Sequence, residues 1–174
     1  MLRRISGYID QALELIGKTI AMLVFLMIGV IVFEMAARGL FDMPTSWAHE
    51  FTSWLLTLFI FLGGPWALAK GQFVRVDVFH AKMSPKTRAL VDTFVSTLLF
   101  ALFVAVLIWL GGKFAISSFD IGERSATGGW AGPVWVPKFA IPLGSILLSF
   151  AWISHLIRLW AAVVDGTTKE AENA

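Results

Sequence analysis

The fold of this chain is decided by residues 51–69, which read FTSWLLTLFIFLGGPWALA and carry no charged side chain. A transmembrane helix needs about 20 predominantly apolar residues to cross the hydrocarbon core of a bilayer. Three further stretches have uncharged centres of similar character, at residues 19–33, 93–112 and 139–157. The sequence therefore predicts an all-α integral membrane protein with four transmembrane helices.

The composition agrees with a membrane protein. Of the 174 residues, 57% are hydrophobic and 15% are charged, whereas a soluble domain is usually about 45–50% apolar and about 25% charged. The formal net charge of +2 is too small to favour nucleic-acid binding. The chain has no cysteine, which excludes disulfides, thiolate metal sites and thiol nucleophiles.

The four spans are expected at about residues 13–40, 47–69, 88–112 and 138–160 of a single membrane domain, followed by a cytoplasmic tail at 161–174. The first apolar stretch is far longer than the roughly 7–15 residues of a signal-peptide core, so we interpret it as a retained membrane helix. The polar end of the tail, from Thr167, is expected to be disordered.

Local stop signals separate these spans. Residues 42–46 (DMPTS) predict a turn, in which Ser46 is a candidate N-cap for the second helix. Lys70 and Gly71 are predicted to end that helix, and residues 111–113 (GGK) to weaken the far end of the third. Pro65 follows two glycines inside the second span and predicts a kink near Leu62. Such a kink either packs against a neighbouring helix or lines a ligand path.

The distribution of basic residues predicts the orientation of the helices. Ten of the 14 Lys and Arg residues lie in the N-terminal segment, the loop after the second span and the C-terminal segment. The other four lie near the remaining two loops. Because cytoplasmic loops are enriched in Lys and Arg, both termini are predicted to be cytoplasmic.

Glu34 and Arg38 are charged residues near the outer end of the first span. Residues four apart share a helix face and can pair, and an unpaired acid at bilayer depth costs about 2.5–3.5 kcal/mol on insertion scales. Three roles stay open for the two residues: an ion pair that fixes helix packing, a contact with a partner subunit, or a proton or substrate relay. The scarcity of other ionisable residues deep in the spans argues against the relay.

Trp47 and Glu50 open the second helix at the predicted outer face. The helix dipole alone accounts for an acid in a first turn. The alternative is that Glu50 contacts Arg38 or a partner subunit.

The three histidines do not suggest a haem site. His49 and His155 are expected at opposite ends of a hydrocarbon core about 30 Å thick, and His80 in the cytoplasmic loop. The sequence also contains no metal-ligand cluster, Gly-rich phosphate loop or hydrolase motif. We therefore expect no catalytic residues, no metal, no cofactor and no enzymatic activity.

Residues 72–79 (QFVRVDVF) follow the second span and mix apolar residues with two charges. This pattern predicts a short segment that lies in the inner membrane interface. Arg75, Asp77 and Lys82 are its candidates for contact with lipid headgroups.

Five segments in this order resemble the small, DctQ-type membrane subunit of tripartite ATP-independent periplasmic (TRAP) transporters. They are residues 33–41 (FEMAARGLF), 44–50 (PTSWAHE), 61–71 (FLGGPWALAKG), 74–78 (VRVDV) and 137–144 (PKFAIPLG). The family often has two acids where this chain has His49 and Glu50, so the resemblance carries over only Trp47 and Glu50 as site residues.

The resemblance implies a subunit of the bacterial inner membrane that pairs with a large permease subunit. A periplasmic binding protein delivers an organic acid, and an ion gradient drives its import by symport. The small subunit would scaffold the large one. With Glu34, Arg38 and Pro65 from the residue pattern, Trp47 and Glu50 complete the candidates for the partner interface or for packing. Two alternatives stay open: a structural or assembly membrane protein, and the membrane anchor of a redox enzyme.

Overall fold

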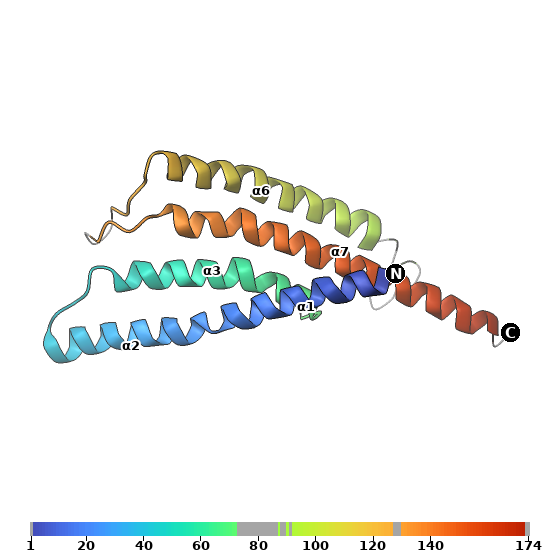
Figure 1. Cartoon of the computed structure of the whole chain (residues 1–174), viewed down its shortest axis with the longest axis horizontal. Coiled ribbons are helices and arrows are strands. Elements are labelled where there is room, and N and C mark those ends of the chain that lie inside the picture. The colour runs from blue at the N-terminus through green and yellow to red at the C-terminus, as the bar shows by residue number, and fades with distance from the viewer. Residues whose placement is uncertain (1, 73–86, 88–89, 91, 127–129, 173–174) are drawn as a thin grey trace.

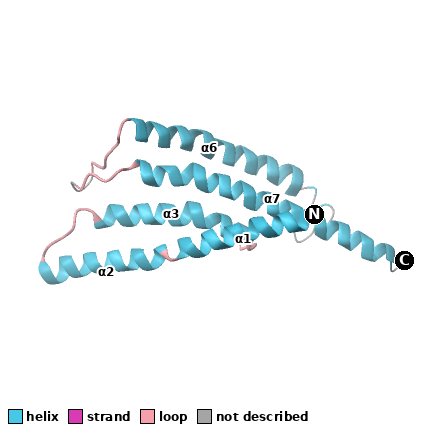
Figure 2. Cartoon of the chain, in the orientation of Figure 1, coloured by secondary structure: helices cyan, strands magenta, loops and turns pink. Residues whose placement is uncertain are grey.

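The computed structural model describes residues 2–72, 87, 90, 92–126 and 130–172. The helices of these residues are α1 (Leu2–Ala21), α2 (Leu23–Phe41), α3 (Ala48–Ala69), α6 (Thr97–Asp120) and α7 (Trp135–Glu172), with a π-helical turn at Asp92–Ser96 leading into α6. Figure 2 shows the described chain as helices joined by loops. The segment predicted to lie in the inner interface, with Arg75, Asp77 and Lys82, is outside the described residues.

Four stretches of the described chain are long and apolar enough to cross a membrane: Ser6–Phe41, Ala48–Ala69, Thr93–Asp120 and Trp135–Ala161. The predicted fold class, an all-α protein with four membrane-spanning helices, is confirmed. The helices run past the predicted spans at several ends. A helix continues beyond the hydrocarbon core wherever its sequence allows, so helix bounds and membrane boundaries are different quantities.

The helices lie side by side in the order α6, α7, α3 and α2 (Figure 1). α7 packs against α3 and α6, and α1 packs against α3 and α7. Both termini lie at one end of the bundle, which we call the terminal end (Figure 1). The α2–α3 and α6–α7 loops lie at the other end, which we call the loop end.

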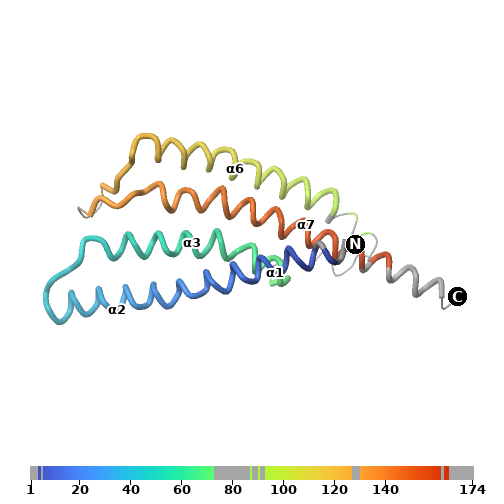
Figure 3. The backbone as a smooth tube through the Cα atoms, viewed as in Figure 1, coloured from blue at the N-terminus to red at the C-terminus, as the bar shows by residue number. Residues whose placement is uncertain are grey.

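The first span is built from two helices. Figure 3 shows α1 continuing into α2 without a reversal, with Met22 between them. There the amide of Met22 donates to the carbonyl of Thr19 at 3.2 Å, and that of Phe25 to Met22 at 3.1 Å. The hydroxyl of Thr19 donates to the Leu15 carbonyl at 2.9 Å, a local bond that often bends a helix.

Two predicted stop signals are confirmed. Gly71 has a φ of 70° directly after the C-cap of α3, Lys70, a left-handed conformation that glycine adopts without strain. Asp42 has a φ of 54° at the C-cap of α2, and the next amide, that of Met43, donates to the Ala37 carbonyl at 3.0 Å. The predicted turn at residues 42–46 therefore begins with a standard helix-ending motif.

Two local predictions are wrong. Ser46 is not the N-cap of α3, because Trp47 holds that position and makes no side-chain capping bond. α7 continues to Glu172, where a disordered tail was predicted. α6 passes through Gly111 and Gly112 and ends at Asp120, and the weakening expected at these glycines stays a prediction. A single glycine costs a helix only about 1 kcal/mol, and the residues after Gly166 include the good helix formers Lys, Glu and Ala.

α3 and α7 approach each other closely at a proline and a glycine. Pro65 is fully buried within α3, and proline leaves the carbonyl four residues earlier, that of Phe61, without its helical donor. A Cβ added at Gly144 of α7 would lie 2.2 Å from the Phe61 carbonyl oxygen. Gly144 therefore lets α7 cover the carbonyl that Pro65 frees, which is how membrane helices accommodate proline. The kink expected near Leu62 stays a prediction.

The described chain buries few large apolar side chains. Leu13, Leu68 and Ala151 form one buried cluster at the junction of α1, α3 and α7. Many large apolar side chains of α2 and α6 are exposed instead, among them Phe25, Val32, Leu40, Leu98, Phe103 and Leu110. In water such a surface would drive association. In a bilayer it faces lipid or other membrane helices.

Candidate functional site

The ionisable residues of the described chain gather toward the two ends of the bundle, and the loop end holds most of the predicted site residues. Glu34 and Arg38 form an ion pair there, with 2.8 Å between Glu34 Oε1 and Arg38 Nη2. The other Glu34 oxygen accepts hydrogen bonds from the Thr45 amide, at 3.1 Å, and from the Thr45 hydroxyl. Glu34 therefore ties the α2–α3 loop to α2, and its side chain is only 16% exposed, whereas that of Arg38 is 69% exposed.

Aromatic side chains form a row across the loop end, from α2 over α3 to the α6–α7 loop. Its ring pairs have centroids 5.0–6.3 Å apart, the range in which aromatic rings attract each other beyond simple burial. The row contains Phe33, Trp47, Phe51, Trp130 and Trp54. Trp47 sits between α2 and α3, because it stacks on Phe33 and meets the edge of Phe51.

Glu50 holds the α6–α7 loop against the start of α3. Its carboxylate accepts a hydrogen bond from the Trp130 indole at 2.8 Å and another from the Ser125 hydroxyl. Among the described residues, these loop groups bind Glu50 and Arg38 does not. We call the three residues Glu50, Ser125 and Trp130 the loop latch.

The same loop is held to the start of α7 by a second acid. Glu123 pairs with Lys138, and a short antiparallel bridge joins Arg124 to Pro133. The Lys138 ammonium, followed by the Ser118 hydroxyl, holds the pKa of the Glu123 carboxyl below its ordinary value of 4.5. The loop between α6 and α7 is therefore fixed at both of its ends by charged hydrogen bonds.

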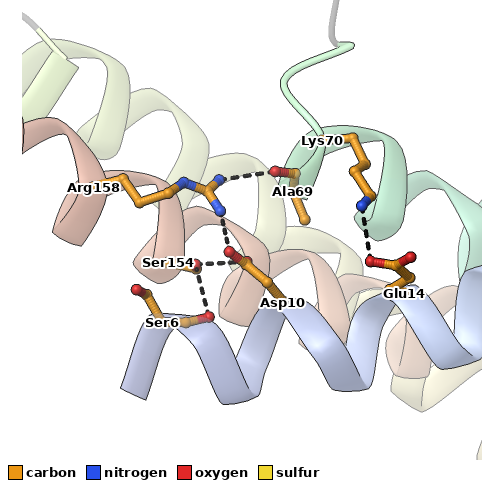
Figure 4. A network of polar contacts seen from close by, with 7 residues as sticks. All are labelled: Ser6, Asp10, Glu14, Ala69, Lys70, Ser154 and Arg158. Carbon is orange, nitrogen blue, oxygen red and sulfur yellow. Dashed lines mark hydrogen bonds and ion pairs between the residues drawn. The ribbon is translucent and has the colours of Figure 1, made fainter. Parts of the chain in front are cut away.

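A polar network at the terminal end ties three helices together (Figure 4). Asp10 of α1 pairs with Arg158 of α7 and accepts a hydrogen bond from the Ser154 hydroxyl at 2.7 Å. The Arg158 guanidinium also donates to the Ala69 carbonyl at 2.9 Å. That carbonyl is at the end of α3, where the helix itself offers no donor. Arg158 therefore caps α3 while it neutralises Asp10.

Glu14 adds a second link at the same end. Its carboxylate pairs with Lys70 and with Lys18, each at 2.8 Å. Lys70 follows α3 and Glu14 belongs to α1, so this pair joins the two helices beside the Asp10 network (Figure 4).

Some of the residues that form the contacts at these two ends were predicted from the sequence. Sequence reasoning singled out Glu34, Arg38, Trp47 and Glu50, which lie together at the loop end. It missed the partners that come from distant segments: Thr45, Ser125, Trp130, Asp10, Ser154 and Arg158. Asp10 offered a weak signal, as an acid four residues before Glu14 in a segment that leads into an apolar span.

The polar side chains at both ends bind one another, and this arrangement holds helices and loops in place. In the part of the chain that the structure describes, no group of three or more His, Cys, Asp or Glu residues could hold a metal ion. Pro65 is buried, so it acts through packing within the chain.

Comparison with known proteins identifies the family. Residues 27–162 match the family model of the DctQ component of tripartite ATP-independent periplasmic transporters. The chain is also similar to the sialic acid TRAP transporter permease protein SiaT of Haemophilus influenzae (strain 86-028NP), with 29% identity over 148 residues. The match covers 84% of this chain but only 22% of the relative. The family model matches well over half of the chain, and the described chain has four helices that are long and apolar enough to span a membrane. The protein therefore belongs to the DctQ family of TRAP transporter components.

Proposed function

We propose that this chain scaffolds the large permease subunit of a TRAP-type secondary transporter in the bacterial inner membrane. In this proposal a periplasmic binding protein delivers an organic acid, and an ion gradient drives its import through the large subunit. The small subunit holds the static part of the transporter and performs no chemistry.

The observation that carries this proposal is the placement of charge. The ionisable side chains of the described spans lie toward the two ends of the bundle and several are paired there, as in Glu34–Arg38 and Asp10–Arg158. α3 carries no charge from Phe51 to its last residue, Ala69. A carrier that moves an anion and its coupling ion needs polar or ionisable groups near mid-membrane. Their scarcity here supports a scaffold beside a separate transport path.

Two further observations support a partner in the membrane. The apolar side chains of α2 and α6 are exposed at the two edges of the bundle, where a larger subunit and lipid can both be accommodated. The matched region is about a fifth of the Haemophilus permease. This supports a division in which the transport path belongs to a larger component.

The candidates for partner contact differ in exposure. The side chain of Arg38 is mostly exposed, whereas little of the Glu34 side chain is exposed. Trp47 and Glu50 shape the loop end through the aromatic row and the loop latch. We therefore expect direct contact with a partner at Trp47, and an indirect role for Glu34, Glu50 and Pro65. The Arg38 side chain stays exposed beside them.

Co-purification tests the partnership. The full chain, with an affinity tag, is expressed together with the products of its neighbouring genes and extracted in mild detergent. The proposal expects a large multi-span permease to elute with the tagged chain in a fixed ratio. A tagged chain that elutes without any membrane partner would contradict the proposal, as would the absence of a permease gene nearby.

A further inference from the structure

A groove opens between α2 and α3 at the loop end. It has a volume of about 370 Å³ and is lined by Ile31, Glu34, Met35, Arg38, Ala48, His49 and Thr52. Ala48 is buried and forms part of its floor, whereas Met35 and His49 are exposed at its sides.

The groove lies where the membrane interface is expected. α3 has 22 residues, which is about 33 Å at 1.5 Å per residue, close to the roughly 30 Å hydrocarbon core of a bilayer. Its first residues, Ala48 and His49, are therefore at one boundary of that core. Arg38 is three residues from the end of α2 and lies at the same end.

The polarity of the groove changes with depth. Arg38 and His49 line it near the interface, while Ile31 lies about two turns deeper along α2 than Arg38. Met35 lies between them. A mouth that carries the exposed Arg38 guanidinium, paired with Glu34, and leads into an apolar channel matches the shape of a phospholipid, with a phosphate at the headgroup level and an acyl chain below it.

Arg38 has donors to spare for such a phosphate. Within the described part of the chain, its guanidinium contacts Glu34 through one nitrogen, and an arginine carries five N–H donors. The Glu34 carboxylate is already bound by Arg38 and by Thr45, and both Glu34 and Arg38 line the groove. Arginine binds phosphate oxygens in a directed, charge-assisted way.

We propose that this groove is a phospholipid site, in which Arg38 binds the lipid phosphate and Ile31 and Met35 contact an acyl chain. The inference rests on the membrane embedding of the chain and not on the transport role. A bound lipid would fill the gap between α2 and α3 and brace α2 against the rest of the bundle.

Native mass spectrometry of the full chain tests the site. The protein is reconstituted in nanodiscs of phosphatidylethanolamine, phosphatidylglycerol and diacylglycerol and then released in mild detergent. The wild type is expected to retain one phospholipid of either headgroup, and diacylglycerol, which lacks the phosphate, is expected not to be retained. Arg38→Gln should reduce the retained phospholipid roughly tenfold, because one charge-assisted hydrogen bond contributes at least that factor.

Two variants make the test specific. Met35→Trp should also reduce retention by filling the groove, since Met35 is exposed and its replacement leaves the Glu34–Arg38 pair in place. Lys113→Gln should have no effect, because Lys113 is another exposed cation in the same half of the bundle, over Trp109 rather than in the groove. Unchanged retention in Arg38→Gln, or equal retention of diacylglycerol, would overturn the proposal. If Arg38→Gln lost binding to the large subunit but retained lipid as the wild type does, the groove would be a protein contact and the proposal would also be overturned.

Discussion

At the scale of single residues, the carboxylate of Glu50 joins two segments that are far apart in the sequence. It belongs to the first turn of α3, and its partners Ser125 and Trp130 come from the α6–α7 loop. The helix dipole explains why an acid is favourable at this position. The loop latch shows in addition that the α6–α7 loop is held by this carboxylate.

Glu50→Ala is therefore expected to loosen the α6–α7 loop. The change removes an ionised acceptor and leaves the Trp130 N–H without a partner, at a cost of about 1.5–3 kcal/mol. Trypsin should cleave after Arg124 faster in the variant than in the wild type, in detergent at neutral pH. Asp120→Ala, at an exposed position near the same loop, is the matched control and should leave the cleavage rate unchanged. Equal cleavage in Glu50→Ala and wild type would show that the latch does not hold the loop.

The pair formed by Glu123 and Lys138 gives a prediction on pH. The pKa of Glu123 is below 4.5 in the folded protein, so the folded state favours the ionised carboxyl more than the unfolded state does. The pair's contribution to the free energy of unfolding is therefore complete above about pH 4.5 and is lost as the pH falls through the lower folded pKa.

Thermal unfolding of wild type and Glu123→Gln in detergent checks this. At pH 6 the melting temperature of the wild type should be higher than that of Glu123→Gln. This difference should shrink as the pH is lowered below 4.5. A difference that grows toward low pH would contradict the assigned direction.

At the scale of elements, the contact between α3 and α7 depends on a glycine. A Cβ at Gly144 would press on the backbone of Phe61, which cannot move aside as a flexible side chain can. Gly144→Ala is expected to reduce the free energy of unfolding by about 1–3 kcal/mol, the usual cost of overpacking.

Gly112→Ala is the matched control for this prediction. Gly112 is also within a transmembrane helix, α6, but an added Cβ there meets no atom within 4 Å. Because alanine is the better helix former by about 1 kcal/mol, this variant should be as stable as the wild type or more stable. Equal stability of the two variants in unfolding experiments would show that the close α3–α7 approach is not needed.

The sequence predicted elements better than it predicted contacts. Apolar runs and the signals at Asp42 and Gly71 are local, and a helix in a membrane satisfies its own backbone, so the fold class and two helix ends were predictable. The bond between Asp10 and Arg158 joins residues 148 positions apart, and no local pattern pairs them. Gly111 was interpreted only as a weak point near the far end of the third span. Its lack of a side chain instead lets Ile141 of α7 come close.

At the scale of the whole molecule, both ends of the chain lie at the terminal end of the bundle (Figure 1). A chain that crosses the membrane four times has both ends on the same side. The excess of basic residues in the N-terminal segment, the loop after the second span and the C-terminal segment predicts that this side is the cytoplasm. The polar network of Figure 4 would then lie on the cytoplasmic side, and the loop latch on the periplasmic side.

Cysteine labelling tests that orientation directly, because the natural chain has no cysteine. In spheroplasts, a membrane-impermeant maleimide should label Ser46→Cys in the α2–α3 loop. It should label Thr167→Cys in the C-terminal segment only after the membrane is permeabilised. The reverse pattern would place the loop end in the cytoplasm and overturn the predicted orientation.

We propose that the chain is a scaffold that a larger subunit requires, and reconstituted uptake tests this most directly. Proteoliposomes receive the large subunit with or without this chain, a sodium gradient, the periplasmic binding protein and a panel of radiolabelled organic acids that includes sialic acid. Gradient-driven uptake of one of these acids is expected only when both membrane subunits are present. Uptake at the full rate by the large subunit alone, or uptake by this chain alone, would contradict the account.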